Sequence, residues 1–235
     1  MKKIIITGGS GRFGSLLKNH KTNHKLFFPK KNELDICKEK LINKYLKKIK
    51  PDIVIHLAGL SRPMNTHETN ISKSISLNII GTANITKCCF ENNIKLIYFS
   101  TNYVYPGIKG NYKELDALSP VNNYAWSKLG GESSVQLYKN SLILRVCMTE
   151  KPFVHKKAFT NVKTNFAYHE EIIPILFKVI DEKGIINIGG KTQSIYNFAK
   201  KENPKIKKIF LDKKKSIIPI NSSMNLTKLK KILRK

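Results

Sequence analysis

The sequence predicts an α/β fold in which a doubly wound parallel sheet is followed by a small C-terminal lobe. Short apolar runs alternate with longer segments of helical periodicity, and a glycine-rich turn follows the first apolar run directly. The chain has 235 residues, which is enough for one large α/β domain with a small appended lobe but too short for two independent domains of average size.

The alternating elements follow one another along most of the chain. The expected strands cover residues 2–7, 25–28, 52–57, 95–100, 142–146 and 185–188, and the expected helices cover 38–49, 72–91, 122–139, 169–180 and a segment after 194. Strands that alternate with helices need crossover connections, which produce a parallel sheet. The pattern loosens after Cys147. We therefore expect one domain over residues 1–147 and a small lobe over 148–235, with part of the second segment able to return to the sheet.

The chain is strongly basic, with 43 Lys and Arg against 16 Asp and Glu and a formal net charge of +27. This charge could indicate a nucleic-acid partner, anionic small ligands, or only a composition rich in Lys, Asn and Ile. The lysines are spread over the whole length and no aromatic residues are interleaved with them as stacking platforms. This distribution favours compositional bias together with anionic ligands and argues against a nucleic-acid partner.

Several features predict a cytoplasmic protein without membrane contact. No apolar run approaches the ~20 residues that a membrane helix needs, and Gly8 and Gly9 interrupt the apolar N-terminal segment too early for a signal peptide. The cysteines show no C-x-x-C spacing or regular framework, so we expect reduced thiols at positions 37, 88, 89 and 147. His20 and His24 have no convincing third ligand, so no metal site is expected.

The glycine-rich turn reads T-G-G-S-G-R-F-G over residues 7–14 and lies between a predicted strand and a predicted helix. In this context Gly8 allows the tight turn, Gly11 lets the backbone approach a pyrophosphate, and Gly14 lets the helix pack close to the strand. The start of the helix offers free N–H groups and a partial positive charge to phosphates. The turn therefore predicts a Rossmann-type dinucleotide site that also includes Arg12 and Phe13.

Two basic positions bear on the choice of dinucleotide. In NAD-preferring proteins an acidic residue at the end of the second strand binds the ribose hydroxyls. Here that region reads Phe28-Pro29-Lys30-Lys31 and contains no carboxylate, and Arg12 lies in the phosphate turn. Lys30 and Arg12 favour a 2′-phosphate and hence NADP (NADPH) over NAD, although the lysines could also be ordinary solvated surface charges.

A tyrosine and a lysine lie one helical turn apart in Tyr124-Ala125-Trp126-Ser127-Lys128. Residues at i and i+4 share a helix face, and an ammonium beside a phenol favours the phenolate and brings the tyrosine pKa closer to neutral pH. The preceding strand ends in Ser100 and Thr101, which places hydroxyls at the carboxyl edge of the sheet, where ligands bind in such folds. This pattern predicts catalytic roles for Thr101, Tyr124 and Lys128.

The stretch from Ser100 to Glu132 resembles the signature of the dTDP-4-dehydrorhamnose reductase family, within the extended short-chain dehydrogenases/reductases. It reads S-T-N-Y-V-Y-P-G-I-K-G-N-Y-K-E-L-D-A-L-S-P-V-N-N-Y-A-W-S-K-L-G-G-E. The family carries S-T-D-Y-V-F-D-G followed by P-x-N-x-Y-G-x-S-K-x-x-G-E, and its superfamily shares the G-x-x-G-x-x-G spacing of the turn. Further similar blocks cover residues 34–36, 54–59, 78–82, 219–224 and 228–229.

The resemblance implies an NAD(P)H-dependent reductase that acts on the keto group of a nucleotide-activated sugar. It implies that Thr101 hydrogen-bonds the substrate carbonyl, Tyr124 transfers the proton, and Lys128 holds the nicotinamide ribose and tunes Tyr124. A homodimer is compatible with this prediction. The resemblance also implies that the cofactor contacts Asp35, Ile36, Leu57, Ala58 and Gly59.

The chain departs from the family pattern at several positions. Asn102 replaces an Asp next to the catalytic Thr, Ala125 replaces a Gly, and Met148 occupies the place of an aromatic residue that meets the sugar nucleotide. Asn102 and Met148 are thus the expected substrate-binding residues beside Thr101, and the identity of the sugar stays open.

Two alternative functions stay open as well. An epimerase or dehydratase of the same superfamily also uses Thr, Tyr and Lys, although a dehydratase usually carries acidic residues next to the Thr. A non-catalytic NADP-binding regulatory subunit, like the β subunit of methionine adenosyltransferase, is compatible with the shortened substrate lobe.

Overall fold

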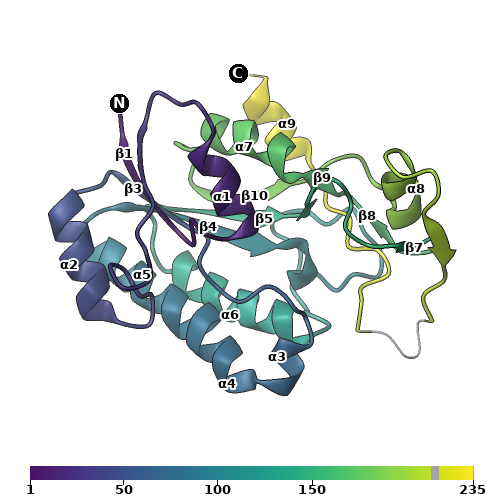
Figure 1. Ribbon diagram of the computed structural model, residues 1–235, viewed down its shortest axis with the longest axis horizontal. Helices are drawn as coiled ribbons and strands as arrows, with labels where there is room; N and C mark the ends of the chain where they lie inside the picture. The colour runs from purple at the N-terminus through teal and green to yellow at the C-terminus, as the bar shows by residue number, and fades with distance from the viewer. Residues whose placement is uncertain (213–216, 235) are drawn as a thin grey trace.

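The computed structural model describes residues 1–212 and 217–234 and is built around a six-stranded parallel sheet (Figure 1). The strand order is β10-β5-β4-β3-β1-β2, and every neighbouring pair is parallel. The strands of this sheet are β1 (Lys3–Thr7), β2 (Lys25–Phe27), β3 (Ile53–His56), β4 (Lys95–Thr101), β5 (Ser141–Val146) and β10 (Gly184–Ile188).

Helices cover both faces of the sheet (Figure 1). The α-helices are α1 (Arg12–Lys18), α2 (Glu39–Ile49), α3 (Thr66–Thr69), α4 (Ile71–Ser74), α5 (Gly81–Glu91), α6 (Asn123–Gln136), α7 (His169–Lys178), α8 (Ile195–Lys200) and α9 (Thr227–Leu233). Helices α1, α7 and α9 pack on one face, and α2, α5 and α6 pack on the other. The predicted doubly wound α/β fold is therefore confirmed.

Both faces of the strands are apolar because both are covered. In β1, Ile4 and Ile6 contact the layer of α1, α7 and α9, whereas Ile5 contacts the layer of α2, α5 and α6. All three side chains are fully buried. Burial of each such side chain contributes about 1.5–3 kcal/mol to folding, so the layers of the core are specified by this alternation.

The predicted strands and all but one of the predicted helices are confirmed, with ends that shift by a few residues. The strand expected at 185–188 is β10, which pairs with β5 in the main sheet. Part of the chain after residue 147 thus returns to the sheet. The short helix α9, which the sequence pattern did not reveal, packs on the same face through Leu229.

The single helix expected over 72–91 is divided into three parts. α4 is followed by a π-helical segment, η1 (Ile75–Ile80), and then by α5. Within η1, the Asn78 side chain accepts a hydrogen bond from Leu60 N (2.7 Å) and donates one to Leu60 O (2.9 Å). Gly131 of α6 lies directly against the Asn78 carbonyl, where a Cβ would collide. Such a local widening of a helix is common at functional sites.

The rest of the C-terminal segment forms a lobe of short strand pairs beside the sheet (Figure 1). The pairs are β6 (Met148–Thr149) with β9 (Ala167–Tyr168), β7 (Lys157–Phe159) with β12 (Lys207–Ile209), and β8 (Lys163–Thr164) with β11 (Gln193–Ser194). The lobe has its own apolar cluster, made of Ala158, Val162, Ile195, Ala199, Ile206 and Leu211. Near the C-terminus, the chain returns to the first part of the protein through a bridge between Met224 and Tyr112.

Among the described residues, no helix has both the length and the apolar character needed to cross a bilayer.

Candidate active site

The glycine-rich turn joins β1 to α1 at the point where the strand order reverses, because β2 and β3 lie on opposite sides of β1. Gly8 has a φ of +71°, and a Cβ there would lie 2.7 Å from Ala58 N. A Cβ on Gly14 would collide with the Gly8 carbonyl, whereas one on Gly11 would approach only Gly8 O, at 3.1 Å. Gly8 and Gly14 are therefore needed for packing, and the exposed Gly11 leaves space for a ligand to approach the backbone.

The other predicted residues of the turn differ in their environment. The Phe13 ring is buried, 5.1 Å from the Phe99 ring and 5.6 Å from the His169 ring between centroids. Its side chain belongs to the core, so a ligand could meet Phe13 only through its backbone. Arg12 is exposed, and its Nη2 donates a hydrogen bond to Ser61 Oγ (3.0 Å).

The residues predicted to contact the rest of a dinucleotide lie on two loops. Leu57 N and Ala58 N, after β3, both donate hydrogen bonds to Thr7 Oγ1 (3.2 Å), which holds the segment with Gly59 beside the turn. Lys30, Asp35 and Ile36 lie on the loop after β2. Of these, Lys30 is exposed, Asp35 accepts a hydrogen bond from the Cys37 amide, and Ile36 packs against Gly81.

Thr101, Tyr124 and Lys128 lie together at the carboxyl edge of the sheet. Thr101 ends β4, and its side chain lies close enough to the Tyr124 phenol to lower the pKa of that group. Tyr124 and Lys128 lie one turn apart in α6, whose start is fixed by a hydrogen bond from Ala125 N to Asn122 Oδ1 (2.8 Å).

The electrostatics of this group follow from its burial. Burial raises the pKa of Tyr124, while the nearby Thr101 side chain lowers it in part. Burial also lowers the pKa of Lys128 to about 7, against the opposing effect of the Glu132 carboxylate. The Lys128 ammonium lies 4.2 Å from the centroid of the Tyr98 ring, a cation–π contact that favours the charged form. Tyr124 is thus a neutral phenol near pH 7, one helical turn from a lysine whose charge changes near that pH.

The two predicted substrate residues occupy different environments. Asn102 is buried, and its Nδ2 donates hydrogen bonds to Ser222 Oγ (2.8 Å) and Thr164 Oγ1 (3.3 Å). Its amide therefore holds the lobe and the C-terminal segment to the end of β4. Met148 lies in β6 and is only partly buried. Substrate contacts of Asn102 and Met148 stay predictions.

A buried ion pair beneath the site was not expected. Glu132 of α6 and Arg145 of β5 are 0% and 1% exposed, and Arg145 Nη2 lies 2.5 Å from Glu132 Oε1. Glu132 also accepts a hydrogen bond from Ser100 Oγ (2.6 Å), and Arg145 donates one to the Tyr105 hydroxyl (2.8 Å). The buried cluster Ser100–Glu132–Arg145–Tyr105 locks α6 to β4 and β5. A single arginine within the apolar run S-L-I-L-R-V was the available signal.

A buried histidine beside Tyr124 was also missed. His67 of α3 is 0% exposed, and its ring makes an edge-to-face contact with the Tyr124 ring at 5.1 Å. His67 Nδ1 lies 2.7 Å from Ser74 Oγ, and Nε2 has no hydrogen-bond partner among the described residues. Burial lowers its pKa, so the ring is neutral at pH 7. A histidine in the loop after a strand gave no specific sequence signal.

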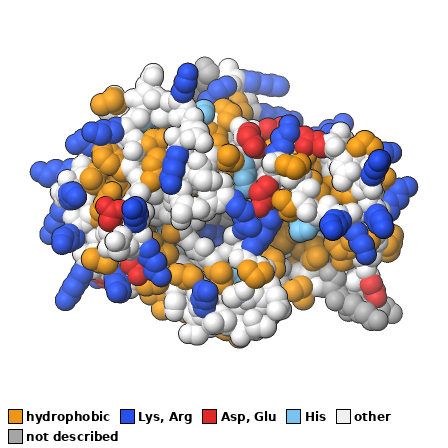
Figure 2. All heavy atoms as spheres, in the orientation of Figure 1, with side chains coloured by type: hydrophobic (Ala, Val, Ile, Leu, Met, Phe, Trp, Pro, Cys, Tyr) orange, Lys and Arg blue, Asp and Glu red, His pale blue; other side chains and the backbone are white. Residues whose placement is uncertain are grey.

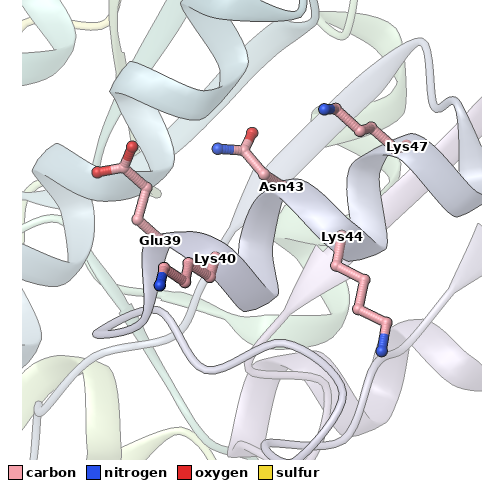
Figure 3. Close-up of a pocket in the computed structure, with 5 residues that line it drawn as sticks. All are labelled: Glu39, Lys40, Asn43, Lys44 and Lys47. Atoms are coloured by element: carbon pink, nitrogen blue, oxygen red, sulfur yellow. The ribbon is translucent and has the colours of Figure 1, made fainter.

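Among the described residues, the basic side chains along α2 do not converge on a site. Figure 2 shows Lys and Arg side chains scattered in separate groups over the visible face. A depression along α2 is lined by Lys40, Lys44 and Lys47, but Figure 3 shows these side chains diverging instead of converging. At the edge of that region, Glu39 lies close to Cys88 and Glu91, and the Lys87 ammonium pairs with both carboxylates.

The fold and site together define a Rossmann-type α/β protein with Thr, Tyr and Lys side chains grouped at the carboxyl edge of its sheet. Residues 1–166 match the family described as RmlD substrate binding domain. The chain belongs to this family.

Individual relatives are similar to this chain in sequence, and a solved structure is similar in fold. The chain is 29% identical over 199 residues to dTDP-4-dehydrorhamnose reductase of Aggregatibacter actinomycetemcomitans, covering 83% of this chain and 64% of that protein. It is 30% identical over 158 residues to methionine adenosyltransferase 2 subunit beta of Danio rerio, covering 62% and 47%. The fold is similar to that of dTDP-4-dehydrorhamnose reductase from Bacillus anthracis in complex with NADP, with a TM-score of 0.87, 22% identity and coverage of 98% and 92%. The chain thus spans about half to two thirds of the length of these curated relatives.

Proposed function

We propose that the protein is an NADP(H)-dependent reductase that acts on the keto group of a nucleotide-activated sugar. The observation that carries this proposal is the grouping of Thr101, Tyr124 and Lys128 at the carboxyl edge of the sheet, next to the glycine-rich turn. Membership of the RmlD family and similarity to a dTDP-4-dehydrorhamnose reductase support the same reaction.

The residues around the glycine-rich turn fit a nicotinamide dinucleotide. The turn would hold its phosphates at Gly11 and the first amides of α1, and the segment Leu57–Gly59 would line its other side. Lys128 would hold the nicotinamide ribose. The bound cofactor supplies the hydride for the reaction.

The remaining chemistry belongs to side chains of this chain. Thr101 donates a hydrogen bond to the substrate carbonyl and polarises it. Tyr124, a neutral phenol because burial raises its pKa, donates its proton to the oxygen as negative charge develops there. The Lys128 ammonium then stabilises the phenolate that remains. His67 packs against the Tyr124 ring and restricts its orientation.

The preference for NADP rests on Arg12 and Lys30, which are basic and exposed and which follow β1 and β2 in the chain. The Bacillus relative was solved with NADP. Parallel fluorescence titrations with NADPH and NADH test this preference. Tighter binding of NADH would refute it, and no response to either would refute the cofactor assignment.

The lobe after residue 147 supplies the substrate-binding surface in this proposal, apart from β10, which belongs to the sheet. Asn102 and Met148 lie where the lobe meets the sheet and would contact the sugar. All four cysteines are free thiols, as suits the reducing cytoplasm in which we place the reaction. The predicted homodimer stays a prediction.

A second candidate is a non-catalytic regulatory subunit, favoured by the 30% identity to methionine adenosyltransferase 2 subunit beta. The two functions differ in turnover. Purified protein mixed with NADPH and a set of 4-keto nucleotide sugars should show a loss of nicotinamide absorbance. Binding of NADPH without turnover of any such sugar, together with a protein partner that copurifies at a fixed ratio, would establish the regulatory role instead.

A further inference from the structure

Two arginines from distant parts of the chain converge on one carboxylate beside the proposed active site. Arg62 Nη1 lies 3.0 and 2.9 Å from the two carboxylate oxygens of Glu150, and Arg12 Nε lies 3.3 Å from Glu150 Oε1. Arg12 begins α1, Arg62 follows β3, and Glu150 follows β6. The arginine segments follow β1 and β3, so both belong to the carboxyl edge of the same parallel sheet.

This ionic cluster, Arg12–Glu150–Arg62, carries an excess positive charge and unused donors. The Glu150 side chain is 18% exposed, whereas those of Arg12 and Arg62 are 44% and 35% exposed. Among the described residues, Nη1 of Arg12 and both Nε and Nη2 of Arg62 donate no hydrogen bond. The Glu150 carboxylate therefore balances only one of the two guanidinium charges, and it leaves some of their N–H groups without an acceptor.

The cluster borders the residues that hold the reacting groups. Arg12 is part of the glycine-rich turn. Both arginines lie close enough to Tyr124 for their charges to lower the pKa of its phenol. Arg62 also acts on Tyr103, which neighbours Tyr124 with ring centroids 6.4 Å apart.

We propose that Arg12 and Arg62 form a binding site for a diphosphate group, and that Glu150 occupies this site as an internal counter-ion until the diphosphate displaces it. Guanidinium groups match phosphate oxygens in charge and geometry, and a diphosphate brings more negative charge and more acceptors than a carboxylate. This inference rests on the proposed function, because both ligands of that reaction carry a diphosphate: the dinucleotide and the sugar nucleotide.

The location of Glu150 gives the exchange a structural consequence. Glu150 directly follows β6 of the lobe, whereas Arg12 and Arg62 belong to the nucleotide-binding part. The ion pairs therefore tie the lobe to the turn. Arrival of a diphosphate on the arginines releases this link, so binding and the position of the lobe become coupled.

The test measures binding without turnover. Arg62→Gln and Glu150→Gln are titrated by calorimetry with NADPH, with dTDP and with inorganic pyrophosphate. Arg62→Gln should weaken diphosphate binding about 10-fold, and Glu150→Gln should strengthen it about 3- to 10-fold because the competing charge is gone. Glu39→Gln is the matched control. Glu39 lies on α2 (Figure 3), and its carboxylate pairs with Lys87 at 2.9 Å. Removal of this carboxylate should change the affinity for none of the three ligands.

The sign of the two effects decides the question, and thermal unfolding confirms that each variant is folded. If Arg62→Gln weakens the binding of NADPH and Glu150→Gln strengthens it, the site belongs to the dinucleotide. If the same two opposite changes occur in the binding of dTDP, the site belongs to the sugar nucleotide. If the cluster were only a structural link, both variants would shift affinity in the same direction or not at all, which would overturn the inference alone. A wild-type protein that binds neither NADPH nor dTDP would overturn the proposed function and this site with it.

Discussion

The protein contains two carboxylate–arginine clusters near Tyr124, and they differ chiefly in their access to water. Glu132 and Arg145 are almost completely buried, and they hydrogen-bond further to the Ser100 and Tyr105 hydroxyls and to the Glu114 carbonyl. Glu150 lies between two partly exposed arginines that keep unused donors. A buried pair cannot lose one member without leaving an isolated charge, whereas an accessible pair can exchange its partner. The same chemical groups therefore build a fixed support in one place and an exchangeable site in the other.

In the proposed mechanism Tyr124, and neither cluster, transfers the proton, so its substitution gives the largest expected effect. Tyr124→Phe removes the proposed proton donor and should lower turnover about 10²- to 10⁴-fold, while NADPH affinity changes little. Nicotinamide absorbance with a 4-keto nucleotide sugar measures turnover. Tyr138→Phe is the control, because that hydroxyl bonds the Ile94 carbonyl away from the site. Full activity of Tyr124→Phe would remove the proposed mechanism.

Loss of one partner of the buried pair should cause the next largest effect. Glu132→Ala leaves the Arg145 guanidinium buried and unpaired, and should lower the free energy of unfolding by about 3–5 kcal/mol. Urea denaturation followed by circular dichroism measures this change. The double variant Glu132→Leu with Arg145→Met, which removes both charges, should recover much of the loss. A single variant as stable as the wild type would contradict the fixed role of this pair.

The pH dependence of turnover should also differ between variants of the two clusters. The pKa of Lys128 is lowered to about 7, so its ammonium is charged below that pH and neutral above it. Turnover at saturating NADPH should therefore fall as the pH rises through about 7. Glu132 raises the pKa of Lys128, so Glu132→Gln should move this decline to lower pH. Glu150→Gln is the comparison variant and should leave the midpoint in place; an equal displacement by both would show that the clusters act alike.

The smallest effect should come from the exchangeable cluster. Glu150→Gln should lower the free energy of unfolding by less than about 1 kcal/mol, because its partners stay in contact with water. The same urea experiment measures this value next to that of Glu132→Ala. A loss near that of the buried pair would show that Glu150 is a structural support, and the distinction between the clusters would fail.

The sequence predicts the parts of the fold and site whose signals are local. The turn from Gly8 to Gly14, and the Tyr124–Lys128 pair, each lie within a few residues of chain, where backbone geometry fixes their relation. The apolar runs that alternate with helices likewise predict the sheet, because the burial of its strands appears in the sequence as short runs of apolar residues. The structure confirms the fold and places Thr101 near Tyr124, which lies one turn of α6 from Lys128.

The missed features depend on contacts between distant residues or on very short elements. Arg62 and Glu150 are 88 residues apart in the sequence, and no periodicity relates them. Strands of two residues, such as β6 and β8, cannot show an alternating pattern. Within the π-helical segment Asn78 hydrogen-bonds the backbone of the distant Leu60, a contact that the apolar pattern of a helix does not encode.

The distribution of thiols makes the protein suited to site-specific labelling. Burial raises the pKa of Cys88 and Cys147 to about 12, and Cys89 is fully buried as well. Cys37 is the exposed thiol, two residues after Asp35 on the loop that the proposed cofactor would border. A maleimide fluorophore should therefore attach at one position of the native chain. Its emission would report occupancy of the adjacent loop in real time, without any engineered cysteine.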